Sequence, residues 1–148
     1  MDKILLLHGA NLNFLGKRNA SHYGTLTLED IIKITKAEAA KFNLEVIAYQ
    51  SNHEGYLIDK LQAEASNCVG LIINPGAFTH YSYALYDALL DAALPSVEVH
   101  LSNIKKREDW RKKSVTAQAC IKIISGKKED GYKDAVKILA ECLNNADY

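Results

Sequence analysis

Glu98 and His100 are the residues whose types and spacing most clearly suit chemistry. They lie two positions apart in the apolar run 96–100, so in an extended strand both side chains point to the same face. A carboxylate inside such a run needs a partner, because an unpaired buried charge is costly. A histidine oriented by a glutamate is a common acid–base unit. A purely structural pair explains the same two residues, so the spacing leaves both interpretations open.

Two further polar residues flank another apolar run. Residues 69–73 carry no charge and suit a strand buried on both faces. Pro75 ends the run, because proline fixes φ, lacks an N–H and disfavours a helical conformation at Asn74. Asn74 and His80 are therefore expected between the carboxyl end of a strand and the start of a helix, where open α/β sheets bind ligands. A simple turn at Asn74 and a helix cap at His80 are the alternatives.

A long loop follows the first apolar run, residues 4–8. Residues 9–24 show no helical period, although the loop after a strand in this kind of fold usually takes only a few residues. Loops of this length are more often functional than idle. This one carries Asn11, Arg18 and Tyr23, none of which is remarkable when considered alone.

Ser102 and Asn103 follow the run 96–100 and precede a basic segment. We predict a short helix there, with Arg107 and Arg111 one turn apart. Free N–H groups at the start of a helix bind anions, although Ser102 and Asn103 also suit simple capping. Arg111 taken alone is typical of a solvated surface.

The arrangement of strands and helices explains how these segments can meet. Runs of strand length occupy residues 4–8, 44–49, 69–73, 96–100 and 119–125. Helical periods lie between them and after the last, over residues 28–42, 54–67, 81–94 and 132–143. Alternating strands and helices predict an α/β domain with a five-stranded parallel sheet, flavodoxin-like order 2-1-3-4-5, and helices on both faces. That order brings the three polar loops together at one edge.

The composition excludes several classes of function. The 148 residues fit one domain, 1–148, and 18 Lys plus Arg balance 18 Asp plus Glu, so no basic field attracts nucleic acid or a membrane. The three cysteines lack zinc spacing and indicate reduced thiols in the cytoplasm. No run is long enough to span a membrane. No phosphate loop or dinucleotide fingerprint is present, so the chemistry left is proton transfer beside a carbonyl, elimination or hydrolysis.

The polar residues singled out above fall into a recognisable set of motifs. These are Gly-Ala-Asn-Leu-Asn at 9–13, Arg18, Tyr23-Gly24, Asn-Pro-Gly-Ala-Phe-Thr-His at 74–80 and Glu-Val-His-Leu-Ser-Asn at 98–103. In these motifs, and over nearly the whole chain, the sequence resembles the type II 3-dehydroquinate dehydratases. These lyases remove water from 3-dehydroquinate to give 3-dehydroshikimate in the shikimate pathway. The resemblance implies a flavodoxin-like fold and an enzyme without metal, Schiff base or nucleotide cofactor.

The resemblance also implies catalytic roles. Tyr23 would take a proton from the carbon beside the ketone. A free tyrosine is protonated at neutral pH, so a cation must stabilise its phenolate, and Arg18 is the expected one. Asn11 would hold the enolate oxygen, directly or through water. His100, oriented by Glu98, would protonate the departing hydroxyl.

The same resemblance implies how the substrate is bound. Asn74 and the backbone N–H groups of Leu101 and Ser102 would hold its carboxylate. His80 and Arg111 would bind its ring hydroxyls. The site would take this small molecule with no nucleic acid or membrane partner.

Assembly is the last implication. Asp87 would reach the site of a neighbouring subunit, in a dodecamer built from trimers. The rival to this whole interpretation is a non-catalytic flavodoxin-like module that binds a small anion or a protein at the same edge. It predicts affinity without turnover, and it leaves the combination of Arg18, Tyr23 and His100 unexplained.

Overall fold

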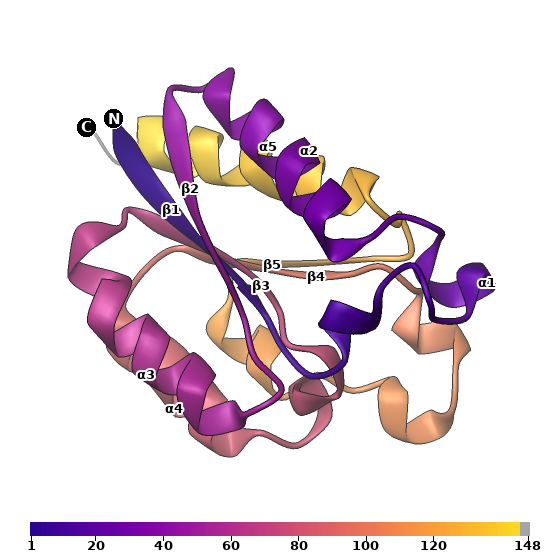
Figure 1. The fold of residues 1–148 in the computed structure, drawn as a ribbon. Coiled ribbons are helices and arrows are strands. Elements are labelled where there is room, and N and C mark those ends of the chain that lie inside the picture. Colours follow the sequence, from indigo (N-terminus) through magenta and orange to yellow (C-terminus); the bar gives the residue numbers. More distant parts are fainter. Residues whose placement is uncertain (146–148) are drawn as a thin grey trace.

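A parallel sheet forms the centre of the molecule in the computed structural model, which describes residues 1–145 (Figure 1). Its strands are β1 (Asp2–His8), β2 (Leu44–Gln50), β3 (Gly70–Asn74), β4 (Ser96–His100) and β5 (Lys122–Ser125). They pair in the order β2-β1-β3-β4-β5, all parallel. The predicted α/β fold and its 2-1-3-4-5 order are therefore confirmed.

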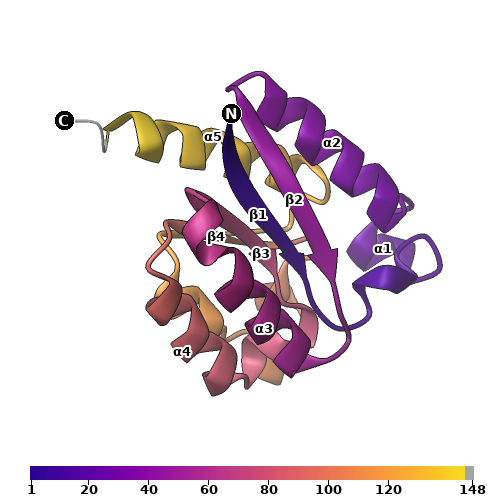
Figure 2. The same ribbon diagram turned by 60° about the vertical axis from the view of Figure 1, so that its left-hand side comes forward.

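Helices cover both faces of this sheet. The helices are α1 (Ala20–Tyr23), α2 (Leu28–Ala40), α3 (Glu54–Glu64), α4 (Tyr83–Ala92) and α5 (Asp130–Asn145). Helices α2 and α5 lie on one face, and α3 and α4 on the other (Figures 1 and 2). No helix within residues 1–145 is long and apolar enough to cross a bilayer.

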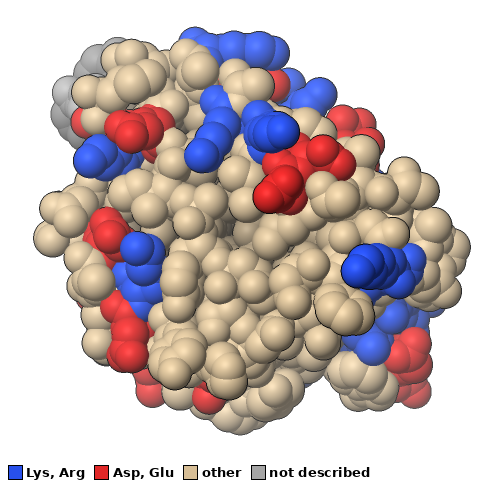
Figure 3. All heavy atoms as spheres, in the orientation of Figure 1, with Lys and Arg blue, Asp and Glu red and all other residues tan. Residues whose placement is uncertain are grey.

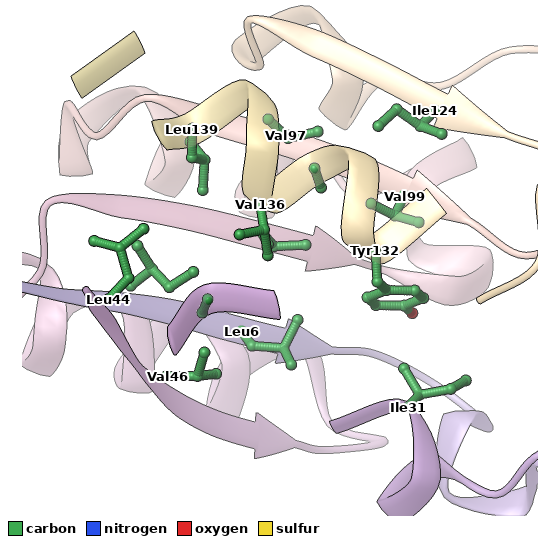
Figure 4. Packing of buried hydrophobic residues seen from close by; sticks show 14 of the residues in the cluster. Leu6, Ile31, Leu44, Val46, Val97, Val99, Ile124, Tyr132, Val136 and Leu139 are labelled. Atoms are coloured by element: carbon green, nitrogen blue, oxygen red, sulfur yellow. The ribbon is translucent and has the colours of Figure 1, made fainter. Parts of the chain in front are cut away.

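The core is divided by the sheet into two layers. Successive side chains of a strand point to opposite faces, so Ile4 and Leu6 of β1 pack toward α2 and α5, whereas Leu5 and Leu7 pack toward α3 and α4. Figure 4 shows the first layer, in which side chains of α5 interdigitate with those of the strands. Both layers exclude water almost completely, which makes the sheet a rigid support for its loops.

Charged side chains are mixed over the surface. On the face shown in Figure 3, Lys and Arg lie along the top and at both sides with Asp and Glu near them, and an extended uncharged area lies across the middle. The absence of net charge thus reflects mixed signs and not a lack of charged residues.

The start of α2 is a capping box. The Thr27 hydroxyl accepts a hydrogen bond from the Asp30 N–H, and the Asp30 carboxylate accepts one from the Thr27 N–H. Such caps stabilise a helix by about 1 kcal/mol. This helix therefore begins where its sequence signal places it.

Two segments differ from their predicted form. The helix expected around Arg107 and Arg111 is instead two 3₁₀ turns, Ile104–Lys106 and Asp109–Arg111, with Arg107 extended between them. The extended residue directs its side chain into the protein, which a continuous helix would not allow. The fifth strand begins at Lys122 and not at Ala119, because Thr116–Ala119 form a 3₁₀ turn.

The two long connections also contain short helical turns. The loop 9–24 includes a 3₁₀ turn at Leu12–Phe14 and the single-turn helix α1. A further 3₁₀ turn, Gly76–His80, precedes α4, which begins at Tyr83 after its Ser82 cap. These turns are too short to leave a periodic signal in the sequence.

Close backbone contact joins the loops after β1 and β3. The Gly9 N–H donates to the Asn74 carbonyl at 2.8 Å. A Cβ at Gly9 would lie only 2.0 Å from the Pro75 carbonyl oxygen, so glycine is required at this crossing. The contact holds both loops at one edge of the sheet.

Candidate active site

A cavity opens at the carboxyl ends of β1, β3 and β4. All predicted site residues except Glu98 and Asp87 line it; these are Asn11, Arg18, Tyr23, Asn74, His80, His100, Leu101, Ser102 and Arg111. The sheet order therefore does bring the three polar loops together, as expected for this edge.

Glu98 and His100 form a buried pair at the end of β4. His100 Nε2 lies 2.8 Å from the Glu98 carboxylate. The same carboxylate accepts hydrogen bonds from the hydroxyls of Thr79 at 2.7 Å, Ser114 at 2.7 Å and Thr116 at 2.5 Å. Glu98 is completely inaccessible to solvent, so these donors replace the water that it loses.

His100 and the hydroxyl donors together keep Glu98 charged. Burial alone would raise the pKa of its carboxyl, but the hydrogen bonds from His100, Thr116 and Ser114 outweigh burial and hold the pKa below its usual value. Glu98 therefore stays ionised and can orient His100 through Nε2. Nδ1 is then the atom of His100 left to exchange a proton with a bound molecule.

Tyr23 lies between two guanidinium groups. Arg107 Nη1 donates a hydrogen bond to the Tyr23 hydroxyl at 2.7 Å. The Arg18 guanidinium carbon lies 3.7 Å from the centre of the Tyr23 ring. Both cations are thus in direct contact with the tyrosine, one at its hydroxyl and one over its ring face.

Arg107 is the main residue that the sequence reasoning missed. Arg107 follows Ser102 in the basic segment, but the resemblance implies only Arg18 as the cation beside Tyr23. In the structure Arg107 contacts the hydroxyl, whereas Arg18 lies over the ring face. Arg107 also donates to the Ser102 hydroxyl at 3.3 Å, which joins the tyrosine to the loop after β4.

Three arginines make the cavity strongly positive. Burial, together with repulsion from Arg107 and Arg111, lowers the pKa of Arg18, and attraction to Tyr23 opposes this effect. The guanidinium stays charged even so. Crowded cations are stabilised by a bound anion, so the cavity suits a carboxylate or an ionised phenol.

The loop after β4 is held by the turn after β5. The carbonyls of Leu101 and Ser102 accept hydrogen bonds from the N–H groups of Lys128 at 3.2 Å and Gly126 at 3.1 Å. The loop's carbonyl groups are thereby turned toward the β5–α5 connection. This support fixes the backbone at the place predicted to bind an anion.

His80 and Arg111 are joined by Trp110, a second residue that the sequence reasoning did not identify. The His80 and Trp110 rings meet edge to face at 5.3 Å, and the Arg111 guanidinium carbon lies 4.0 Å from the Trp110 ring centre. His80 Nδ1 donates to the Lys113 carbonyl at 2.8 Å, and burial lowers the pKa of His80. A neutral His80 therefore has Nε2 available to accept a hydrogen bond.

Asn11 sits in a left-handed conformation with φ of 71°. Its N–H donates to the Asn52 side chain at 2.9 Å, and Gln50 donates to the Gly9 carbonyl at 3.2 Å. Asparagine adopts this conformation more readily than most residues. The end of β2 thus supports the loop that presents Asn11.

Asp87 lies apart from the other predicted residues. It is exposed on α4 and does not line the cavity. Its expected contact is with a neighbouring subunit, so a single chain does not test it and the role stays a prediction.

Comparison with known proteins gives a consistent result. The chain matches the family described as class II dehydroquinase over residues 2–140. A 3-dehydroquinate dehydratase from Corynebacterium glutamicum is 51% identical over 140 residues, which is 95% of this chain and 97% of the relative. One from Clostridium acetobutylicum is 49% identical over 142 residues, covering 96% and 99%.

Solved structures agree with the sequence relatives. The type II dehydroquinase from Butyrivibrio crossotus superimposes with a TM-score of 0.90 at 44% identity, covering 93% of this chain and 97% of that one. A 3-dehydroquinate dehydratase-like protein from Bifidobacterium longum gives a TM-score of 0.71 at 28% identity, covering 97% and 99%. The matches span the whole sheet and all three loops that form the cavity.

Proposed function

The chain belongs to the class II dehydroquinase family, and we propose that it removes water from 3-dehydroquinate with Tyr23 as the base and His100 as the acid. One observation carries the assignment of roles. A tyrosine in contact with two cations and a histidine paired with a buried glutamate line the same cavity. An elimination needs such a base and such an acid on one substrate.

The first step is removal of a proton. The Tyr23 phenolate takes it from the carbon beside the ketone, and the electron pair of that C–H bond moves toward the carbonyl oxygen. Arg107 and Arg18 support this step, because both stabilise the phenolate before the proton arrives. The product of the step is an enolate.

The enolate oxygen must then be stabilised. Asn11 holds it, directly or through a water molecule, from the left-handed turn supported by Asn52. The position of Asn11 on a supported backbone means that little reorganisation is needed when the charge develops.

The second step expels the tertiary hydroxyl. The enolate electrons form the carbon–carbon double bond, the C–O bond breaks, and His100 supplies the proton that turns the leaving group into water. Glu98 stabilises the charged imidazole, because it is ionised and hydrogen-bonded to Nε2.

The remaining residues bind the substrate. Asn74 and the N–H groups of Leu101 and Ser102 hold its carboxylate, next to the cluster of arginines. His80 and Arg111, both packed on Trp110, bind the ring hydroxyls. Placement at several points holds the reacting carbon near Tyr23 and His100.

Ultraviolet absorbance with 3-dehydroquinate tests this proposal. The product has a conjugated double bond and the substrate has none, so absorbance rises with turnover. Tyr23→Phe is expected to abolish the rise while the protein stays folded. The matched control is Tyr56→Phe, an exposed tyrosine on α3 outside the cavity, which should retain the wild-type rate. Substrate binding without turnover by the folded wild-type chain would favour the non-catalytic module.

We also propose that the enzyme assembles into a dodecamer built from trimers, with Asp87 reaching a neighbouring site. Asp87 is exposed on α4 beside Tyr83 and Leu90, which are 67% and 49% exposed. Large apolar side chains around a carboxylate suit a surface covered by another subunit. Sedimentation velocity should give the mass of twelve chains, and a lone monomer would refute the assembly.

The cytoplasm is the compartment that we propose. Cys68, Cys120 and Cys142 are all free thiols, and burial raises the pKa of the Cys120 thiol to about 12. Unpaired cysteines are typical of a reducing compartment. Cell fractionation with an activity assay checks this location.

A further inference from the structure

Three buried polar side chains form a chain that ends at the cavity. His8 and Asn74 are direct partners in the register of β1 and β3, so their side chains lie on the same face of the sheet. Tyr132, in the first turn of α5, reaches both: its hydroxyl lies 3.0 Å from His8 Nε2 and 3.0 Å from Asn74 Nδ2. Figure 4 shows Tyr132 projecting from α5 into the layer between helix and sheet.

Only one assignment of donors and acceptors satisfies these hydrogen bonds. The Gly76 backbone N–H can only donate, and it donates to Asn74 Oδ1 at 3.1 Å. Asn74 therefore turns its NH₂ group toward Tyr132, whose oxygen accepts. The tyrosine's own proton must then go to His8 Nε2, which has to be an unprotonated acceptor.

The environment of His8 agrees with this assignment. The side chain is completely buried, and burial lowers its pKa to about 3, so the ring is neutral at any pH at which the enzyme works. Its proton then sits on Nδ1, which has no hydrogen-bond partner among residues 1–145. A buried donor without a partner is costly, and such a cost is often retained where it serves a function.

Only Asn74 of the three reaches the cavity. Tyr132 and His8 are fully buried and do not line it. One N–H of the Asn74 amide is used by Tyr132, which leaves the second as a donor for a bound molecule. Rotation of the amide by half a turn would instead offer an oxygen, which repels a carboxylate.

We propose that Tyr132, itself oriented by His8, is a positioning residue that holds the Asn74 amide with an N–H donor facing the substrate carboxylate. The inference rests on the proposed function, because it requires Asn74 to bind that carboxylate. Without the Tyr132 hydroxyl, the inner N–H of Asn74 has no acceptor, and only the Gly76 N–H still holds the amide.

The kinetic constants of Tyr132→Phe test the proposal. The change removes one oxygen and keeps the ring, so the core stays filled. KM for 3-dehydroquinate should rise about tenfold, the loss of one hydrogen bond to a charged group, while kcat stays within about twofold. A fall in kcat with unchanged KM would overturn the proposal.

A double-mutant cycle separates positioning from a general loss of stability. If Tyr132 acts through Asn74, then Tyr132→Phe added to Asn74→Ala leaves KM as it is in Asn74→Ala alone. If the two increases in KM multiply, Tyr132 does not act through Asn74 and the proposal fails. Thermal unfolding of each variant confirms that the chains compared are folded.

His8 supplies a second, independent pair of variants, which also serves if Tyr132→Phe does not fold. In His8→Gln a side-chain oxygen can still accept the tyrosine proton, so KM should stay near the wild-type value. In His8→Leu the acceptor is lost, so the Tyr132 hydroxyl directs its proton toward the Asn74 amide and competes with the Gly76 N–H for the amide orientation, and KM should rise as in Tyr132→Phe. Equal KM values for the two His8 variants would contradict the proposal.

Failure of the proposed function gives a different result. A wild-type chain without turnover refutes the reaction, and calorimetric titration with 3-dehydroquinate then still measures whether Tyr132→Phe weakens binding. Asn74→Ala with an unchanged affinity would refute the role of Asn74 and the positioning together. If Asn74→Ala binds 3-dehydroquinate more weakly than the wild type but Tyr132→Phe binds it equally well, only the positioning role of Tyr132 is refuted.

Discussion

His100, paired with the buried Glu98, and Tyr23 line the same cavity, but a strand holds the histidine and loops hold the tyrosine. Glu98 and His100 are buried at the end of β4, and three hydroxyls complete the hydrogen bonding of the carboxylate. Tyr23 is half-buried on a single helical turn, and its contacts are with arginines from two loops. The acid side is thus preorganised by the sheet, whereas the base side depends on charge.

This difference matches the roles that we propose for the two groups. His100, the proposed acid, needs one orientation, which neutral hydroxyls around Glu98 support without adding charge. Tyr23, the proposed base, needs nearby cations, and long arginine side chains reach it from loops. Variants on the two sides should therefore fail in different ways.

The largest effect is expected from Arg107→Gln on the base side. Loss of the cation that touches the Tyr23 hydroxyl should lower kcat about 100- to 1000-fold, the range seen when one electrostatic donor is removed. Arg107→Lys, which keeps a cation, should recover part of the rate. Steady-state rates of the variants check this, with Lys106→Gln as a neighbouring control. An equal loss in Arg107→Lys and Arg107→Gln would contradict the charge argument.

Glu98→Gln tests the acid side and should give a smaller kinetic effect with a clear effect on stability. We expect kcat to fall about 10- to 100-fold, because His100 loses the charge that orients it. The hydroxyl donors lose acceptor atoms in the core, so the unfolding temperature should also fall. Arg107→Gln, on the loop side, should change the unfolding temperature little. If both variants lower it equally, the two sides of the cavity do not differ in the way described.

Acid should remove the contribution of Glu98 to stability. The pKa of Glu98 is lower in the folded chain than in the unfolded chain, where a glutamate titrates near about 4.3. The contribution is therefore complete above that pH and is lost as the pH falls through the folded pKa. Thermal unfolding from pH 7 to 3 should show a component that Glu98→Gln lacks. An identical decline in both proteins would rule this out.

Trp110→Ala should have a moderate effect on binding. His80 and Arg111 both pack on this ring, and a cation over an exposed indole is worth about 1 kcal/mol, so KM should rise about fivefold with kcat nearly unchanged. Trp110→Phe keeps an aromatic face and should recover most of the affinity. Steady-state kinetics of the two variants show whether an aromatic face is what His80 and Arg111 require. An unchanged KM in Trp110→Ala would show that the ring is not needed.

Lys128→Ala should have the smallest effect. Its ammonium group donates to the Ser21 carbonyl at 3.2 Å, next to Tyr23, but the contact is exposed. One exposed hydrogen bond should change kcat by about twofold at most. Lys127→Ala is the matched control, because Lys127 pairs with Asp134 and touches neither loop of the site. If Lys127→Ala changes kcat more than Lys128→Ala does, the contact of Lys128 with the Tyr23 segment has no specific role.

Much of the fold could be predicted from local patterns. The five apolar runs and the helical periods between them define a parallel sheet, and the capping box at Thr27 marks the start of α2 correctly. The order of the strands was enough to expect Asn11, Asn74 and His100, which lie at or just after strand ends, at one edge. These features depend on neighbours in the sequence or on general rules for parallel sheets.

Arg107, Trp110 and Tyr132 could not be assigned in this way. The basic segment looked like an exposed helix, yet the extended backbone at Arg107 turns its guanidinium onto a tyrosine 84 positions earlier. Tyr132 read as an apolar position of the last helix, and only its contacts with His8 and Asn74, 124 and 58 positions away, reveal a polar role. Pairs so distant leave no periodic or local signal in one sequence.

The sequence by itself determined the order of the sheet, the edge at which the cavity forms and the residue types that reach it, because each depends on local apolar patterning and the geometry of parallel strands. The tertiary structure alone decided which cation touches Tyr23, which hydroxyls surround Glu98 and which side chains orient Asn74. The reason is physical: hydrogen bonds of about 3 Å depend on side-chain direction, and direction is set when distant segments pack against one another.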